Sequence, residues 1–531
     1  NQQSSINNHQ STINIPMSRI ATAFALGIVI ATFFLDTSAA WISLAVATCC
    51  IMAIVATLFI HHPAKRHLTT PLVMLSTMAC GSSYTLTYKI INHTVYPSHI
   101  AQYDIVITSE PIIRTNSIGL NGIIASGHYE GKKVSLAFEK DSTAMALTPG
   151  MGIEALCMLK KPAGPNDDPR FTLHRQSQGI AFFAFLSHHN YRKKAVSTRG
   201  LALWERARIG ALTIRHKAIC TLRDNGLNGD ALATVSAMVL ADKSHLSQKV
   251  YDSFSSSGAA HVLALSGTHL SILFFLITIF VKPIRSKWYV RAFTIITIWG
   301  YVFLVGLPTS AVRAAVMLSW LTMTRIYSKS SSQLHNISLT ALILMIANPM
   351  AIFDISLQMS MMAVIAIVTL VTPLTGSLMN KIELMGIHLF HLSEGNALKY
   401  VVSATILTIV AQTATAPLAA YYFGRLPLYF ILTNFITLPL ATIVIYLTMV
   451  ILVMSPLPIV PSMATPILQA IVSLLNNLLA AISSLPFAAV RIECISLPVL
   501  LFLYLAGFII VTYLQLKQRK QVNNSKFNKI H

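Results

Sequence analysis

Residues 261–276 read HVLALSGTHLSILFFL, an apolar run interrupted by two histidines, two serines, a threonine and a glycine. In a continuous helix, His261, Ser266 and His269 would share a sector of about 140°. Ser266 and Gly267 can instead break the helix, which frees backbone groups to line a path. Ionisable side chains in a membrane segment are costly and are candidates for a functional site. A Ser–His nucleophile pair is an alternative.

The composition extends the prediction of a membrane segment to the whole chain. Its 531 residues are 54% hydrophobic and 11% charged, against about 25% charged residues in soluble domains. We expect some of the shorter apolar spans to be re-entrant or broken, because a straight span needs roughly 20 residues. The predicted spans lie near 19–35, 39–60, 70–90, 258–281, 292–306, 311–327, 336–350, 356–374, 400–424, 428–454, 465–487 and 496–515.

Residues 93–198 differ from the rest, because they alternate short β-type runs with turn residues. Several short strands in such a length predict a small barrel, and a five-stranded OB-like barrel fits the size. A purely structural β-domain without a ligand is the alternative. The fold class predicted is therefore a polytopic α-helical membrane protein with an extracytoplasmic all-β, OB-like domain.

The placement of this domain follows from lysines and arginines in the short loops. They gather after the second, fourth and sixth spans and in the tail at 517–531, while the intervening loops hold mainly Arg425 and Arg491. Cytoplasmic loops carry the excess of basic residues, so the N-terminus and the tail are predicted to be cytoplasmic and residues 93–198 to lie outside. We expect a multi-pass protein of the bacterial inner (cytoplasmic) membrane.

Residues 199–257 are predicted to form basic amphipathic helices. Trp204, Ala211, Ile214 and Leu222 share one helical side, although Arg208 and Arg215 intrude on it. Such a helix is typical of a lipid surface.

The basic residues of the β-domain need a separate reason, because long loops escape the charge bias. A polyanion arriving from outside is one reason, and a merely solvated surface is the other. The candidate DNA-binding residues are Lys132, Lys133, Lys160, Lys161, Arg192, Lys193 and Lys194.

Three further clusters carry polar residues among apolar ones. GLPTSAVRAAVML (306–318) places Arg313 after a helix break, NPMAIFDISLQMSMM (348–362) places Asp354 just past another, and Gln412 and Asn434 lie in later spans. An Arg313–Asp354 ion pair, either functional or purely structural, is a hypothesis. Repeated helix breaks with buried polar groups are typical of transporters and channels.

Together these segments resemble the ComEC family of competence proteins, the channel for DNA internalisation. In LADKSHLSQKVYDSFSSSGAAHVLALSGTHLSIL the chain keeps the family's Asp-basic turn and its Ser-Gly-x-His, with Ala241 where the family tends to have Gly. SAVRAAVM is similar to its Ser-x-x-Arg-Ala segment, and FDISLQMS to its Asp-x-Gly-Phe-Gln-Leu-Ser segment. The metallo-β-lactamase-like domain that ends some members, with its His-x-His-x-Asp-His signature, is not found in this sequence.

The resemblance implies a channel or translocase component that carries single-stranded DNA across the inner membrane, with no catalytic residues, metal or cofactor. The expected domains are membrane helices in 1–92, the β-domain in 93–198, basic helices in 199–257, the channel in 258–516 and the tail in 517–531. The residues expected to line the path are His261, Ser266, Gly267, His269, Ser310, Arg313, Asp354, Gln358, Ser360, Gln412 and Asn434.

The expected partners are single-stranded DNA, membrane lipid, a DNA receptor on the outer side and a cytoplasmic ATPase or single-strand-binding protein, because no Walker A motif is visible. A homo-oligomer is also considered. The alternatives are a transporter of another anionic polymer or lipid-linked glycan, an intramembrane hydrolase using Ser266 with His261 or His269, and a structural membrane protein.

Overall fold

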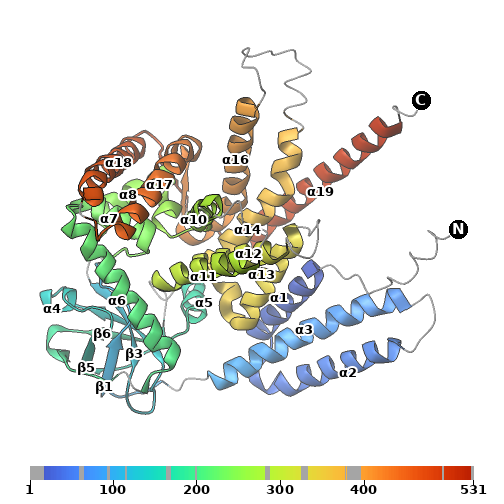
Figure 1. Ribbon diagram of the computed structural model, residues 1–531. Helices are drawn as coiled ribbons and strands as arrows, with labels where there is room; N and C mark the ends of the chain where they lie inside the picture. Colours follow the sequence, from blue (N-terminus) through green and yellow to red (C-terminus); the bar gives the residue numbers. More distant parts are fainter. Residues whose placement is uncertain are drawn as a thin grey trace.

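The computed structural model describes residues 17–58, 65–92, 96–113, 117–162, 169–197, 200–280, 288–324, 333–376, 378, 396–457, 459–492 and 495–527. A β-sheet domain lies at one corner of the molecule, and long helices extend from it (Figure 1). The basic loops at 281–287 and 325–332, which contributed to the predicted orientation, lie outside the described residues.

The β-domain is one sheet that curls around an apolar core. Its strand order is β6-β4-β3-β1-β5-β7, with β4 and β6 parallel and the other pairs antiparallel. Alternating inward residues such as Ile105, Leu136 and Phe182 are fully buried in its core. The strands are β1 (Ala101–Ile107), β2 (Ile112–Ile113), β3 (Ile118–Ile124), β4 (Lys133–Phe138), β5 (Gly152–Cys157), β6 (Ile180–Leu186) and β7 (Tyr191–Lys193).

The five long strands have the connectivity of an OB-type Greek-key barrel. β1, β3 and β4 form a meander, β5 returns to pair with β1, and β6 pairs in parallel with β4. A bridge between Lys160 and Phe183 brings the chain after β5 to β6. Two helices interrupt the strands, α4 (Ser142–Met145) and α5 (Pro169–Ser177). The predicted OB-like domain is confirmed.

Helices occur at the predicted spans, and five of the twelve are long enough to be confirmed as candidate membrane spans. Among the described residues, five helices are long and apolar enough to cross a membrane: Thr37–Ile54, Ile355–Gly376, Val401–Phe423, Phe430–Val453 and Ile459–Ser483. The helices are α1 (Met17–Phe33), α2 (Ala40–Leu58), α3 (Lys65–Ile91), α10 (Gly267–Phe280), α11 (Trp288–Leu304), α12 (Thr309–Thr324), α13 (Gln333–Ala347), α14 (Ile355–Ala366), α16 (Asn396–Phe423), α17 (Phe430–Val453), α18 (Ile459–Ser483) and α19 (Leu497–Phe527). The predicted span 258–281 is divided, because the short α9 (Ala260–Leu263) ends before α10 begins.

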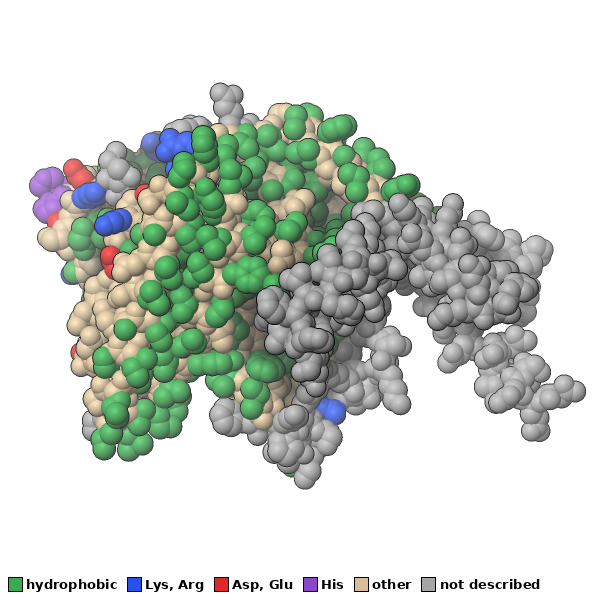
Figure 2. All heavy atoms as spheres, turned by 90° about the horizontal axis from the view of Figure 1, so that it is seen from above, with side chains coloured by type: hydrophobic (Ala, Val, Ile, Leu, Met, Phe, Trp, Pro, Cys, Tyr) green, Lys and Arg blue, Asp and Glu red, His purple; other side chains and the backbone are tan. Residues whose placement is uncertain are grey.

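The face of Figure 2 has the surface of a membrane protein. Hydrophobic side chains cover much of the described part of it, and basic, acidic and histidine side chains gather at one edge (Figure 2). Large apolar residues such as Trp41, Phe293 and Phe508 are exposed on the helices. Together with the apolar helices, this confirms the predicted polytopic membrane fold.

The helices of 199–257 differ from the prediction of a lipid surface. In α6 (Leu203–Asp224) the buried face is formed by Ile209, Leu212, Arg215, Ile219 and Leu222, while Trp204 and Ile214 are 56% and 58% exposed. Ala211 and Leu222 of the predicted apolar side are buried as well, so the buried face overlaps the predicted one only in part. α6 packs against α11, and its Ile209 packs with Val106 and Ile123 of the sheet, so its apolar side is covered by protein.

α7 (Gly229–Leu240) is enclosed rather than interfacial. Every residue from Ala231 to Leu240 is buried, including Thr234 and Ser236. It packs against α17 and α18, and α8 (Gln248–Ser257) packs beside it on α18. A helix that is apolar on all sides belongs in the core, so α7 is part of the helical bundle.

Candidate functional site

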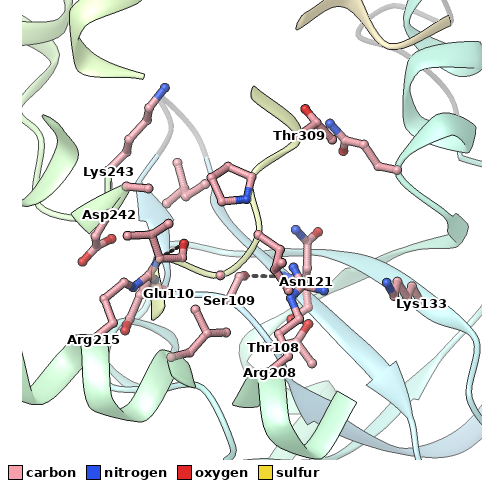
Figure 3. Close-up of a pocket in the computed structure, with 18 of the residues that line it drawn as sticks. Thr108, Ser109, Glu110, Asn121, Lys133, Arg208, Arg215, Asp242, Lys243 and Thr309 are labelled. Atoms are coloured by element: carbon pink, nitrogen blue, oxygen red, sulfur yellow. Dashed lines mark hydrogen bonds between the residues drawn. The ribbon is translucent and has the colours of Figure 1, made fainter. Parts of the chain in front are cut away.

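A cavity of about 570 Å³ lies where the β-domain meets the helices (Figure 3). Its wall is built from the strand ends at 108–112, 121–122 and 133–134, from α6, and from two turns at 241–244 and 305–309. The charged residues that line it are Lys133, Arg208, Arg215 and Lys243, against Glu110 and Asp242. Four cations and two carboxylates line it, and Glu205 beside it pairs with Lys133 at 3.3 Å and with Arg208 at 3.9 Å, so a smaller excess of positive charge remains.

Glu110, Arg215 and Asp242 gather at one end of this cavity, and Lys133 lies across it on the strand side (Figure 3). All three gathered residues are buried, at 8%, 6% and 3% exposure. Arg215 donates a long hydrogen bond of 3.4 Å from Nη1 to the Val305 carbonyl. Arg215 Nε and Asp242 Oδ2 have no hydrogen-bond partner among the described residues. Buried polar atoms of this kind usually have a partner, so these are available to a ligand or to water.

The electrostatics of Glu110 follow from its burial. Desolvation raises the pKa of Glu110, Asp242 raises it further, and Arg215 and His216 oppose the rise. His216 Nδ1 lies 3.5 Å from Glu110 Oε1. Lys243, next to Asp242 in the chain, has its pKa lowered by desolvation. The shift of Glu110 has the sign expected of a buried charge, whereas Lys243 is exposed at the cavity, so its charge is available to a ligand.

The backbone of the two turns is strained. Three described residues other than glycine have positive φ, and two of them line this cavity: Ala241 at 56° and Leu307 at 58°. A side chain in the left-handed region costs roughly 1–2 kcal/mol. Such strain concentrates at functional sites. It also explains why a glycine suits position 241, since glycine has no Cβ to clash there.

The helix break in the opening motif has a defined geometry. Ser266 precedes α10, and its Oγ accepts a hydrogen bond of 3.4 Å from the His269 backbone N–H and contacts the Thr268 hydroxyl. His269 is 3% exposed and its Nδ1 has no partner among the described residues. A Cβ on Gly267 would lie 3.5 Å from the Cβ of Ala314, so α10 crosses α12 closely here. His261, on α9, has its Nδ1 3.2 Å from the Gly258 carbonyl.

The start of α12 joins this break to the cavity. Thr309 lines the cavity, and the next residue, Ser310, donates its hydroxyl to the Leu265 carbonyl in the break. One turn further, Arg313 is 4% exposed and donates from both Nη atoms to Ser356 Oγ at 3.4 Å. The path residues predicted on 306–313 and 261–269 therefore lie side by side.

Among the described residues no salt bridge joins Arg313 to Asp354, so the hypothesised pair is not in direct contact, although the Asp354 charge acts on Arg313. Asp354 caps α14 by accepting a hydrogen bond of 2.9 Å from the Leu357 N–H. Its Oδ2 lies 3.8 Å from His174 Nδ1 on α5, which accepts a 3.3 Å hydrogen bond from the Ile355 N–H. Burial lowers the pKa of His174, and the Asp354 charge opposes that shift. A ring nitrogen that accepts a hydrogen bond carries no proton. The His174 imidazole is therefore neutral, and its contact with the Asp354 carboxylate is not a salt bridge.

The remaining predicted path residues lie farther along the helices. Gln358 on α14 accepts a 2.9 Å hydrogen bond from the Tyr422 hydroxyl and donates one to the Ile352 carbonyl. Ser360, on the same helix, and Gln412, on α16, are half-buried. Asn434 on α17 has a buried Oδ1 without a partner among the described residues.

Three of the seven basic residues predicted to bind DNA are paired with carboxylates. Lys133 lines the cavity and pairs with Glu205 at 3.3 Å. Arg192 and Lys194 are held by carboxylates, with Lys194 Nζ 2.8 Å from Glu154 and 2.9 Å from Asp104. The other four lie in the half-buried turn before β4, in the segment between β5 and α5, and in β7: Lys132, Lys160, Lys161 and Lys193.

Most charges of the cavity were not predicted as part of a site from the sequence. The intrusion of Arg208 and Arg215 on an apolar helix side was the available signal, because residues seven apart share a helical face. Asp242 and Lys243 were noticed only as parts of a motif. Nothing near Glu110 marked it, since its partners are more than 100 residues away in the chain.

Residues 238–517 match the family model described as Competence protein, which is more than half of the chain. The chain belongs to the competence protein family. It is 22% identical over 313 residues to ComE operon protein 3 of Bacillus subtilis (strain 168), covering 58% of this chain and 36% of that protein. It is 29% identical over 184 residues to an uncharacterized protein of Mycoplasma genitalium, covering 34% of this chain and 41% of that protein.

The chain thus aligns with less than half the length of either relative. No solved structure gives a significant match to the chain. The resemblance inferred from the sequence is confirmed at the level of the family. The family match includes the turns at 241–244 and 305–309, while the cavity residues of the β-domain and α6 precede it.

Proposed function

We propose that this protein serves in DNA uptake, as a channel component that carries single-stranded DNA across the bacterial inner membrane during natural transformation. In this proposal the β-domain is extracytoplasmic and receives the strand. The tail is cytoplasmic, where an ATPase or a single-strand-binding protein would draw the strand in, and a receptor outside would deliver it.

The observation that carries the proposal is the cationic cavity at the junction of the β-domain and the helices. Proteins that bind single strands combine basic side chains for the phosphates with aromatic rings for the bases. The cavity offers Arg208 and Lys243 together with Trp204, which is 56% exposed and lines the same wall. Its volume of about 570 Å³ is in the range of sites that hold small organic ligands.

The cavity also adjoins the segments that the family match contains. Its edge at Thr309 is followed by Ser310, which bonds to the break before α10. A strand that leaves the cavity would meet this break, where residues between α9 and α10 are not helical. Irregular backbone at membrane depth is tolerated where it lines a cavity or is buried in protein.

Two of the alternatives, the hydrolase and the transporter of another polymer, have less support. A Ser–His nucleophile needs a hydroxyl within hydrogen-bond reach of an imidazole nitrogen, whereas Ser266 Oγ contacts the Thr268 hydroxyl and the His269 backbone. Another anionic polymer or a lipid-linked glycan would use the same cations. Trp204 favours a polymer with bases that stack.

The test substitutes Lys243, which lines the cavity and takes part in no ion pair among the described residues. Cells carrying Lys243→Gln or Trp204→Ala should bind labelled DNA outside as the wild type does and import about tenfold less or worse. That loss corresponds to one charge-assisted contact of about 1.5 kcal/mol.

The matched control is Lys249→Gln, an exposed lysine six residues further along the chain on α8. It should import DNA normally at an equal membrane level. Normal import by both cavity variants would remove the cavity from the proposed path. Normal import after deletion of the whole chain would refute the proposed function.

A further inference from the structure

A second cavity lies on the helical part, away from the β-domain. It has a volume of about 270 Å³ and is lined by Ser256, Ser483, Phe487 and two arginines, Arg425 and Arg491. The arginines belong to a two-stranded ribbon formed by β8 (Arg425–Pro427) and β9 (Ala489–Arg491). β8 packs against α8 and α16, and a Cβ on Gly258 would lie 3.1 Å from Pro427.

The two arginines are directly opposite each other in this ribbon. The Ile492 N–H donates to the Gly424 carbonyl at 3.0 Å, just outside the pair. This makes Arg425 and Arg491 a non-hydrogen-bonded pair, in which the side chains are closest and point to the same face. Like charges in that position destabilise a ribbon. None of the ion pairs among the described residues includes either arginine.

An anion between the two guanidinium groups would turn this repulsion into attraction. Guanidinium groups bind phosphate through parallel charge-assisted hydrogen bonds. The hydroxyl of Ser256 lines the same cavity and can donate to a remaining oxygen, whereas the Ser483 hydroxyl, also in the lining, donates to the Ala480 carbonyl at 2.8 Å. The donor set therefore fits a phosphate or phosphodiester group.

The position of the ribbon indicates which molecule would supply the phosphate group. β8 connects α16 to α17 and β9 connects α18 to α19, so ends of four helices meet there. Three of the four, α16, α17 and α18, contain segments long and apolar enough to cross a membrane. A ribbon that joins such ends lies at the level of the lipid headgroups.

The apolar residues beside the arginines fit that level. Phe487 is 77% exposed, and Leu485 and Leu428 are 41% and 54% exposed. Phe487 is the third described non-glycine residue with positive φ, at 58°. Aromatic side chains at a membrane surface sit among the headgroups, with apolar groups toward the acyl chains.

We propose that Arg425 and Arg491 bind the headgroup phosphate of a membrane phospholipid, with Phe487 and Leu485 against its acyl chains. The site is distinct from the cavity at the β-domain and does not depend on DNA transport. The bound lipid would hold together the two connections between the four helices. A DNA phosphate is the competing occupant.

The test uses the purified full chain in detergent and native mass spectrometry with added phosphatidylglycerol. We expect the Arg425→Gln/Arg491→Gln variant to bind this lipid about tenfold more weakly or worse, because each arginine supplies charge-assisted bonds. Arg425→Lys/Arg491→Lys should retain part of the affinity, and the exposed pair Lys140→Gln/Lys249→Gln should bind as the wild type does. A diacylglycerol, which lacks the phosphate, should show no difference between the wild type and the glutamine variant.

Thermal unfolding separates loss of the site from loss of the fold. Without lipid, the glutamine variant should unfold at the wild-type temperature or higher, because the repulsion between the arginines is removed. With added phosphatidylglycerol, the unfolding temperature should rise for the wild type and for the lysine variant, and it should not rise for the glutamine variant. Equal phosphatidylglycerol affinity in the wild type and the glutamine variant would overturn the proposal. The proposal would also be overturned if a thymidine oligonucleotide displaced the lipid from the wild type and did not bind the glutamine variant. That result would identify the site as one for DNA phosphate.

Discussion

Arg215 shows how one charged side chain can join two parts of a protein. It points from α6 into the cavity, reaches the Val305 carbonyl, and has Glu110 and Asp242 as its electrostatic partners. Burying an isolated charge is very costly, so such groups are retained only with partners. Gly306 permits this arrangement, because a Cβ there would lie 2.9 Å from Leu212 on the same helix.

The buried carboxyl of Glu110 gives the first prediction at this scale. Its pKa is raised, mainly by desolvation, above the ordinary value of 4.5. A raised pKa in the folded state favours the protonated form, so the stabilising contribution is present below pH 4.5 and is lost as the pH rises through the folded-state pKa. The stability of Glu110→Gln relative to the wild type should therefore increase from acid to neutral pH.

The measurement is thermal unfolding of the purified full chain across that pH range. Glu139→Gln, at an exposed position after β4, is the control and should follow the wild type more closely. A relative stability of Glu110→Gln that stays constant or falls with rising pH would contradict the predicted shift.

At the scale of elements, helix ends determine where polar side chains lie. Asp354 was expected on a transport path, yet its carboxylate caps α14 through the Leu357 N–H. A cap satisfies a backbone donor that has no partner in the helix. Ser266 occupies the same position before α10. Both motif residues therefore define where helices begin, whatever else they contact.

The crossing of α1 and α3 depends on two glycines. A Cβ on Gly27 would lie 2.0 Å from the Met78 carbonyl oxygen, and one on Gly81 would lie 2.5 Å from the Phe24 carbonyl oxygen. Small residues let membrane helices approach closely. We expect Gly27→Ala to lower the stability by about 1–3 kcal/mol or more, because the helices must separate.

Gly300→Ala on α11 is the matched control, since a Cβ there would meet nothing within 4 Å. Alanine also favours a helix over glycine by roughly 0.5–1 kcal/mol. Unfolding temperatures of the two purified variants should therefore shift in opposite directions. Equal shifts would mean that α1 and α3 do not cross at these residues.

At the scale of the whole molecule, the β-domain is attached to the helices at two places. One is α6, which packs on both the sheet and α11. The other is α5, whose Ser177 carbonyl accepts a 2.7 Å hydrogen bond from Asn348 and whose His174 accepts one from the Ile355 N–H. The cavity lies between these attachments, so its shape depends on both.

Asn348→Asp tests the second attachment. The change keeps the oxygen that caps Met350 and removes the donor to the Ser177 carbonyl. A buried acceptor left without a partner costs about 1–3 kcal/mol. We expect faster hydrogen exchange in α5, with α13 and α14 unchanged. Asn228→Asp is the control, because it loses only a local hydrogen bond to the Gly226 carbonyl and should leave hydrogen exchange in α5 unchanged. Equal protection of α5 in both variants would show that Asn348 does not attach the β-domain to the helices.

Much of the architecture could be predicted from the sequence, because apolar runs and strand alternation are local patterns. They predicted the membrane helices and the OB-like domain, and the motifs predicted the family. The break at Ser266 was also visible, since glycine and serine next to each other weaken a helix. These features depend on residues within a few positions of one another.

The tertiary structure decided which charged residues meet. The face that α6 buries could be read only in part from its own pattern, because the sheet and α11 cover its two sides. The cavity takes residues from the strand ends, α6 and two turns that are far apart in the chain, and Arg425 meets Arg491 only through pairing of β8 with β9. Electrostatic contacts depend on distance in space and on burial, and neither is contained in the spacing of residues along the sequence.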